Sequence, residues 1–299
     1  MVLETVADVC ENTTPIADLS LGVVLVGLWD SKRNKILRIG SGFVVDRKKG
    51  LIVTACHTLM NIRDDENSPF GEDYFGLPYG KALIGVIPRS GDSGIQGEKA
   101  MFRYFAQIIA KDTNIESKGV CHIDACVLRI TTKLEHDVGG NCESIGTTRE
   151  ILLLHNQEGM KKEKLYQLKV ANDKCELDEQ VRVLGFNQGG EGLLSEFQKT
   201  DVDRYLDFAK GYVCKKYRNE NHYDHHHEHH PTGKNVFKPR EEIVVICPTI
   251  GGHSGGPCVN RQGEVIGILS RVDPADPQRC YLVPSCEWKK LVRKAKMAS

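Results

Sequence analysis

The chain has 299 residues, of which 40% are hydrophobic and 27% charged, and its formal net charge is zero. No apolar run reaches the roughly 18 residues that a membrane-spanning helix needs, so we expect no membrane as a partner. The balanced charge gives no electrostatic reason to expect nucleic acid as a partner. The composition is typical of a globular protein with one large domain or two small ones.

Short apolar runs follow one another through the first half of the chain. They are rich in Val, Ile and aromatic residues and too short for most helices, so each run predicts a β-strand. A mostly polar stretch over 131–164 then interrupts the pattern. The expected strands cover residues 21–29, 35–46, 50–59, 81–88, 102–112 and 123–130.

Similar runs resume in the second half and end in a helical pattern. In the closing segment SCEWKKLVRKAK, apolar residues from Trp288 to Ala295 recur at helical spacing, which predicts a C-terminal helix. Many short strands separated by turns are typical of barrels or sandwiches. The expected strands here cover 165–170, 180–186, 207–214, 242–247, 263–272 and 280–284.

Two polar insertions interrupt the strands, at 61–80 and at 187–241. The second insertion contains a possible helix over 193–208, which overlaps the strand expected at 207–214, so one of the two boundaries is wrong. It also holds the histidine tract NHYDHHHEHH. Imidazole binds zinc, copper and nickel well, but this tract has no cysteine partner and no strand context. We therefore predict a solvated loop with adventitious metal binding; regulation by metal or by protonation are the alternatives.

Eleven cysteines are present, with no CxxC pair and no regular spacing. Several of them, such as Cys56, Cys126 and Cys247, lie inside apolar runs, where a free cysteine behaves as a small hydrophobe. The N-terminus lacks the basic start of a secretory signal. These features predict reduced thiols and an intracellular location, cytoplasmic or nuclear.

The stretch GGHSGGP encloses Ser254 in glycines, which suit a tight turn that points backbone amides inward. A serine hydroxyl is a weak nucleophile unless a base takes its proton and a carboxylate orients that base. The candidate base is His57, at the end of an apolar strand, and the candidate carboxylate is Asp124, just before another strand. Asp112 is an alternative carboxylate. The amides of Gly252 and Ser254 are the candidates for holding a developing oxyanion.

These segments, in this order, resemble those of chymotrypsin-fold serine peptidases, closest to the protease domain of the HtrA/Deg branch. GSGFVVDRKKGLIVTACHTL resembles the family's histidine segment, IDACVLRI its aspartate strand, and GGHSGGPCVNRQGEVIGILS its nucleophile loop. The resemblance implies an all-β fold of two six-stranded antiparallel barrels with a C-terminal helix. It divides the chain into an N-terminal extension (1–20), a first barrel (21–150) and a second barrel (151–299).

The resemblance also implies a serine endopeptidase that cleaves proteins or peptides through an acyl-enzyme, without a cofactor. Because the order His57, Asp124, Ser254 is that of chymotrypsin-type enzymes, these residues take the catalytic roles. The residues aligned with the substrate-binding positions are Pro248, Thr249, Ser270, Arg271 and Val272. No acidic residue stands at the expected floor of the specificity pocket, so we expect a small or medium apolar residue before the cleaved bond.

Two departures from the family's pattern affect these expectations. His253 stands where trypsin-like zymogens carry an aspartate, so we expect no activation by N-terminal cleavage and place its side chain toward solvent or the leaving side of the substrate. No PDZ segment follows the closing helix in this sequence, and the oligomeric state stays open. The alternative function is a binding scaffold with a protease fold and no turnover.

Overall fold

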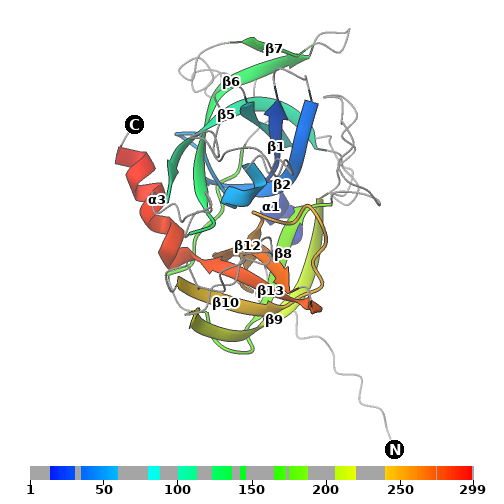
Figure 1. Ribbon diagram of the computed structural model, residues 1–299, viewed down its shortest axis with the longest axis vertical. Coiled ribbons are helices and arrows are strands. Elements are labelled where there is room, and N and C mark those ends of the chain that lie inside the picture. Colours follow the sequence, from blue (N-terminus) through cyan, green and yellow to red (C-terminus); the bar gives the residue numbers. More distant parts are fainter. Residues whose placement is uncertain are drawn as a thin grey trace, which may run out of the picture.

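The computed structural model describes residues 14–30, 35–59, 80–87, 100–112, 123–136, 142–145, 165–172, 175–187, 206–219, 240–273 and 275–297. Two closed six-stranded antiparallel barrels form the molecule, one above the other in Figure 1. Within the described segments, no helix combines the length and the apolar character that crossing a bilayer requires.

The first barrel runs in the order β3-β2-β1-β4-β5-β6 and closes where β3 pairs with β6, from Leu51↔Arg129 to Thr54↔Cys126. A further strand, β7, extends the sheet beyond β6 and lies in the polar stretch for which no strand was expected. The strands are β1 (Val23–Asp30), β2 (Lys35–Asp46), β3 (Leu51–Thr54), β4 (Gly80–Val86), β5 (Met101–Lys111), β6 (Cys126–His136) and β7 (Cys142–Ile145).

The second barrel closes in the order β10-β13-β12-β11-β8-β9. One of its strands, β11, was not expected from the sequence; it is three residues long and follows the serine loop directly. The segment expected as a strand at 165–170 forms only an isolated bridge between Val170 and Val265, so that prediction is wrong. The strands are β8 (Gln180–Phe186), β9 (Leu206–Asn219), β10 (Arg240–Ile246), β11 (Pro257–Val259), β12 (Val265–Asp273) and β13 (Asp276–Pro284).

Three apolar cores explain why the strand sequences are apolar on both faces. Side chains alternate along a strand, so Val24 and Val26 belong to the core of the first barrel, while Val23 and Leu25 belong to another cluster. That cluster also contains residues of the second barrel, such as Leu184, and therefore lies between the barrels. A third core fills the second barrel.

The helices join this framework at its two ends. Helix α3 (Ser285–Met297), the expected C-terminal helix, lies beside the first barrel, and Trp288 packs edge-on against Phe43 with ring centroids 5.6 Å apart. The short helix α1 (Ile16–Ser20) lies in the expected N-terminal extension, where Leu19 is buried in the cluster between the barrels. The domain boundaries at residues 20 and 150 remain predictions.

Candidate active site

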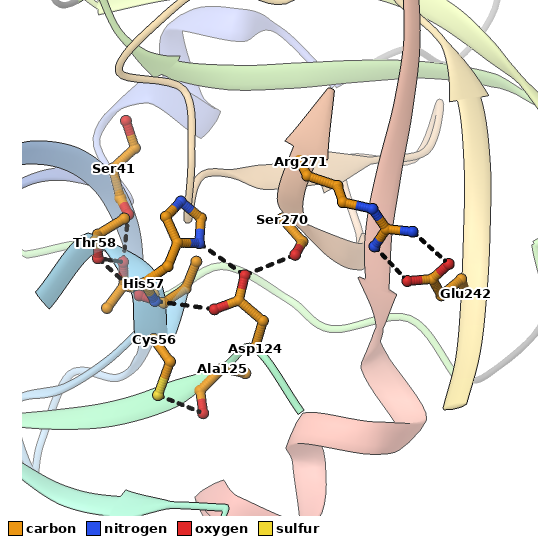
Figure 2. A network of polar contacts seen from close by, with 11 residues as sticks. Ser41, Cys56, His57, Thr58, Asp124, Ala125, Glu242, Ser270 and Arg271 are labelled. Carbon is orange, nitrogen blue, oxygen red and sulfur yellow. Dashed lines mark hydrogen bonds and ion pairs between the residues drawn. The ribbon is translucent and has the colours of Figure 1, made fainter. Parts of the chain in front are cut away.

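His57 lies in η1 (Cys56–Leu59), a single 3-10 turn that follows β3 directly. The strand expected over 50–59 thus ends at Thr54, and the turn directs the imidazole toward Asp124 (Figure 2). The Nδ1 atom of His57 lies 2.7 Å from Oδ2 of Asp124, and the backbone N–H of His57 donates to Oδ1 at 2.9 Å. These two contacts from His57 fix the orientation of the Asp124 carboxylate and of the imidazole ring.

Asp124 stands two residues before β6, the strand that pairs with β3 and closes the first barrel. This closure brings together two residues that are 67 positions apart in the sequence. Burial raises the pKa of Asp124, but the charge of the His57 ring and the hydrogen bonds from His57 and Ser270 outweigh burial. The net pKa of Asp124 therefore lies well below its ordinary value, and the carboxylate stays ionised at neutral pH.

Ser270 supplies the third contact to this carboxylate, from the second barrel. Its Oγ–H donates to Oδ2 of Asp124 at 2.6 Å, and the side chain is buried. Leu269 pairs with Leu282 and Arg271 with Tyr281, so Ser270 is an extra residue in β12, a β-bulge. We expect Ser270 among the substrate-binding residues, and its hydroxyl contacts the carboxylate oxygen that lies against Nδ1 of His57.

The loop that carries Ser254 begins with a tight turn. The N–H of His253 donates to the carbonyl of Ile250 at 3.2 Å, and Gly252 has a φ of +96°. A positive φ at the third position is that of a type II turn, which favours glycine there. The N–H of Gly255 donates to Leu269 in β12 at 2.8 Å, which fixes the far side of the loop.

Ser41, in β2, joins this loop to the first barrel, a contact that the sequence analysis missed. Its N–H donates to the carbonyl of Ser254 at 2.7 Å, and its hydroxyl donates to the carbonyl of Gly252 at 2.7 Å. The same hydroxyl accepts the N–H of Phe186 in β8 at 2.8 Å. The available signal in the sequence was a serine between two glycines in an apolar run. Such a serine is buried here, and a buried hydroxyl needs hydrogen-bond partners.

The loop of Ser254 and the turn of His57 are in direct contact. A methyl group built on Gly255 would stand 2.8 Å from the backbone nitrogen of Ala55, two residues before His57. Within the described part of the chain, Oγ of Ser254 makes no hydrogen bond.

The remaining residues aligned with substrate binding lie around β12 and the start of the loop. Pro248 is exposed, and Oγ1 of Thr249 lies 3.0 Å from Sγ of Cys280. Val272 pairs with Cys280 of β13. Arg271 forms a bidentate ion pair with Glu242 of β10, a residue that the sequence analysis did not single out.

His253 is buried, with 1% of its surface exposed, so the expectation of a solvent-facing side chain is wrong. It packs on Gly185 of β8, where a methyl group would stand 3.0 Å from the imidazole. Neither ring nitrogen has a hydrogen-bond partner among the described residues. Burial lowers the pKa of His253, and the negative charge of Asp207 offsets part of this effect, so the neutral ring is favoured.

This burial predicts a loss of stability in acid. Because the pKa of His253 is lowered in the folded state, the unfolded chain binds more protons below the ordinary value of 6.5, and stability falls as the pH drops through it. The slope is bounded by one proton, about 1.4 kcal/mol per pH unit. Urea unfolding between pH 8 and 5 should show a steeper fall for the wild type than for His253→Leu. Equal slopes for the two proteins would contradict this account.

Asp112 and Cys56 lie next to the segments that carry Asp124 and His57. Asp112, the alternative carboxylate, accepts the backbone N–H of Ile123 at 3.0 Å, so it supports the segment that leads into Asp124. Cys56 is buried beside His57 and its thiol faces the carbonyl of Ala125 at 3.6 Å, as expected for a core residue. The histidine tract and the insertion at 61–80 lie outside the described residues.

Comparisons with known proteins agree with this fold. The family model described as "Trypsin-like peptidase domain" matches residues 40–268. No curated protein matches the chain.

Among solved structures, the active form of the Rv3671c protease from M. tuberculosis is similar, with a TM-score of 0.55 and 14% identity over 95% of this chain and 88% of that one. An inactive Ser343Ala mutant of the same protein gives a TM-score of 0.51 and 13% identity over 96% and 95%. At this identity the likeness concerns the fold. Because the family match covers most of the chain, from β2 to β12, the chain belongs to the trypsin-like peptidase family.

Proposed function

We propose that this protein is a serine endopeptidase that hydrolyses protein or peptide substrates with Ser254, His57 and Asp124. Oγ of Ser254 attacks the substrate carbonyl while Nε2 of His57 takes its proton, and the ring then gives this proton to the leaving amine. Asp124 holds the ring in the tautomer that leaves Nε2 free to accept. Water releases the acyl group by the same route, and the scheme needs no cofactor.

The observation that carries this proposal is the buried pair of His57 and Asp124. The short contact between Nδ1 and Oδ2, at 2.7 Å, places the proton of the neutral ring on Nδ1. The lowered pKa of Asp124 keeps the negative charge that stabilises the protonated ring during the reaction. A histidine that served only packing would not need a buried, ionised carboxylate behind it.

The backbone of the serine loop supports a site for the oxyanion. The N–H groups of His253, Gly255 and Gly256 donate to carbonyls, whereas those of Gly252 and Ser254 have no acceptor within the described residues. Two amides without acceptors beside a nucleophile are the arrangement that stabilises negative charge on a substrate carbonyl. The turn at Gly252 supports an oxyanion site that is formed before substrate arrives.

An open strand edge supports extended peptides as substrates. Strand β11 pairs with β12 only from Val265 to Ile268, so among the described strands Arg271 and Val272 pair only with β13. A peptide that adds to such an edge is held by main-chain hydrogen bonds, and side-chain pockets then give specificity. The proposed substrate contacts lie around this edge and remain Pro248, Thr249, Ser270, Arg271 and Val272.

We also place the protein inside the cell, in the cytoplasm or the nucleus. Six of the cysteines in the described segments are buried, and five of these, Cys126, Cys175, Cys247, Cys258 and Cys280, are free thiols. Buried thiols that form no disulfides are typical of a reducing compartment.

Labelling with a fluorophosphonate that carries rhodamine tests the function on the full chain. Wild-type protein should be labelled at Ser254, as located by peptide mass mapping, and should also hydrolyse fluorescent casein. The Ser254→Ala variant should lose both signals while keeping the thermal transition of the wild type. A folded wild type that takes no label would refute the peptidase and favour the scaffold.

A further inference from the structure

Arg271 is one of the proposed substrate contacts, but its ion pair with Glu242 in the second barrel has no part in the proposed mechanism. Arg271 and Glu242 make two hydrogen bonds, at 2.5 Å and 2.9 Å, between the guanidinium and both carboxylate oxygens. Glu242 is 1% exposed and the side chain of Arg271 is 11% exposed. Bidentate geometry at a buried place fixes the orientation of both side chains.

The pair spans a strand rather than joining neighbours. Arg271 is on β12 and Glu242 on β10, and β13 pairs with both of these strands. Between these two strands, the guanidinium of Arg271 lies 4.1 Å from the centre of the Tyr281 ring, which is a cation–π contact. Figure 2 shows Arg271 and Glu242 facing each other, with Ser270 next to Arg271 on the side of Asp124.

The position of Arg271 in β12 links this ion pair to Ser270. Arg271 directly follows Ser270, the extra residue of the β-bulge, and it pairs with Tyr281 where the regular ladder resumes. A bulged residue has no cross-strand partner, so its direction depends on how its neighbours are held. Arg271 is held by charge, by two hydrogen bonds and by the Tyr281 ring, and this limits where the hydroxyl of Ser270 can point.

The hydroxyl of Ser270 donates to Oδ2 of Asp124, the same oxygen that lies 2.7 Å from Nδ1 of His57. The position of the Ser270 hydroxyl therefore affects how strongly the negative charge on Oδ2 of Asp124 interacts with the imidazole of His57. We propose that Arg271 and Glu242 are positioning residues, which hold the bulge of β12 so that Ser270 stays hydrogen-bonded to Asp124. This role rests on the proposed peptidase function, because it tunes the base of that reaction.

The variants are chosen to keep the fold. Replacing one partner alone leaves a buried charge without its counter-ion, whereas replacing both by apolar residues of similar length is often neutral for stability. The central variant is therefore the double substitution Arg271→Met with Glu242→Met. It is compared with Ser270→Ala, with the triple variant, and with Arg271→Lys, which keeps the charge but loses the planar fork. The matched control is Arg279→Met, an exposed arginine in β13 that pairs with Asp273 and Asp276.

The first readout is the rate constant of fluorophosphonate labelling as a function of pH. Ser270→Ala should lower it about tenfold, because a hydrogen bond to a charged group is lost. It should also raise the midpoint of the acid limb, because a carboxylate with fewer hydrogen bonds attracts the protonated ring more strongly. The double variant should show both the lower rate and the raised midpoint. Arg271→Lys should show smaller changes in the same direction, and Arg279→Met should show neither change.

The triple variant decides whether the pair acts through Ser270. If it does, the triple variant stays about tenfold below wild type, whereas independent effects would multiply to about a hundredfold. A double variant with the wild-type rate and midpoint, or a triple variant at a hundredfold, would overturn the proposal.

The second readout does not depend on activity. The downfield proton resonance of the hydrogen bond between His57 and Asp124 should move equally in Ser270→Ala and in the double variant, and an unmoved resonance in the double variant overturns the proposal. A wild type that shows this resonance but takes no label would refute the peptidase function, and the resonance alone would then decide the role of the pair.

Discussion

Replacing Asp124 with asparagine should lower the turnover of casein about ten-thousandfold while the protein stays folded. Oδ1 of Asp124 accepts the backbone N–H of His57, so the amide oxygen of asparagine must take this place and its NH₂ group must replace Oδ2. An NH₂ group facing Nδ1 forces the ring proton onto Nε2, which then cannot accept the proton of Ser254. The rate of fluorophosphonate labelling should fall with the turnover.

The control for this result is Asp112→Asn, at the other carboxylate considered from the sequence. Asp112 accepts the backbone N–H of Ile123, and an amide oxygen can accept it as well. Its activity should stay within a few-fold of wild type, and circular dichroism should show both variants folded. The assignment of Asp124 fails if Asp112→Asn is the inactive variant of the two.

Replacing Gly255 with alanine should abolish fluorophosphonate labelling and lower the free energy of unfolding by about 3 kcal/mol. Gly255 has a φ of +83°, and a methyl group there would overlap the carbonyl of Ser41 and the hydroxyl of Thr54. The loop must therefore move away from the first barrel, which breaks the contact of Ser254 with Ser41. Labelling and urea unfolding measure the two effects separately.

Gly50→Ala separates this steric effect from the cost of the backbone conformation alone. Gly50 also has a positive φ, of +61°, but the nearest atom to an added methyl group is Cβ of Ile130 at 3.3 Å. It should cost about 1–2 kcal/mol and leave labelling unchanged. Equal losses in the two variants would mean that the close packing of Gly255 contributes nothing.

Periodicity and turn residues were sufficient to place most strands. The predictions for β2 and β8 match the observed bounds. Each run is flanked by turn residues, and the apolar side chains on its two faces enter the cluster between the barrels and the core of its own barrel. The segment 165–170 is similar in composition but pairs at only one residue, since pairing depends on which strand lies beside it. β7 forms from the less apolar run CESI, where pairing with β6 outweighs weak local preference.

The site shows the same limit in its side chains. His57 and Asp124 were identified from the sequence, and the structure brings them together through the pairing of β3 with β6. The contacts of Ser270 and Arg271 depend on a bulge, which no period-two pattern marks. His253 is polar and was expected at the surface, but the close approach of Gly185 encloses it.

Helix α3 has a consequence for how the molecule is made. Trp288 and its neighbours complete the apolar cluster around Phe43, and Arg129 of the first barrel donates to the carbonyl of Ala295. A ribosome makes α3 after both barrels, so the histidine-bearing half acquires its final packing only once the serine-bearing half has emerged. Neither half of the nascent chain holds all three residues of the proposed triad, so the proposed site can form only after the strands of both barrels have been made.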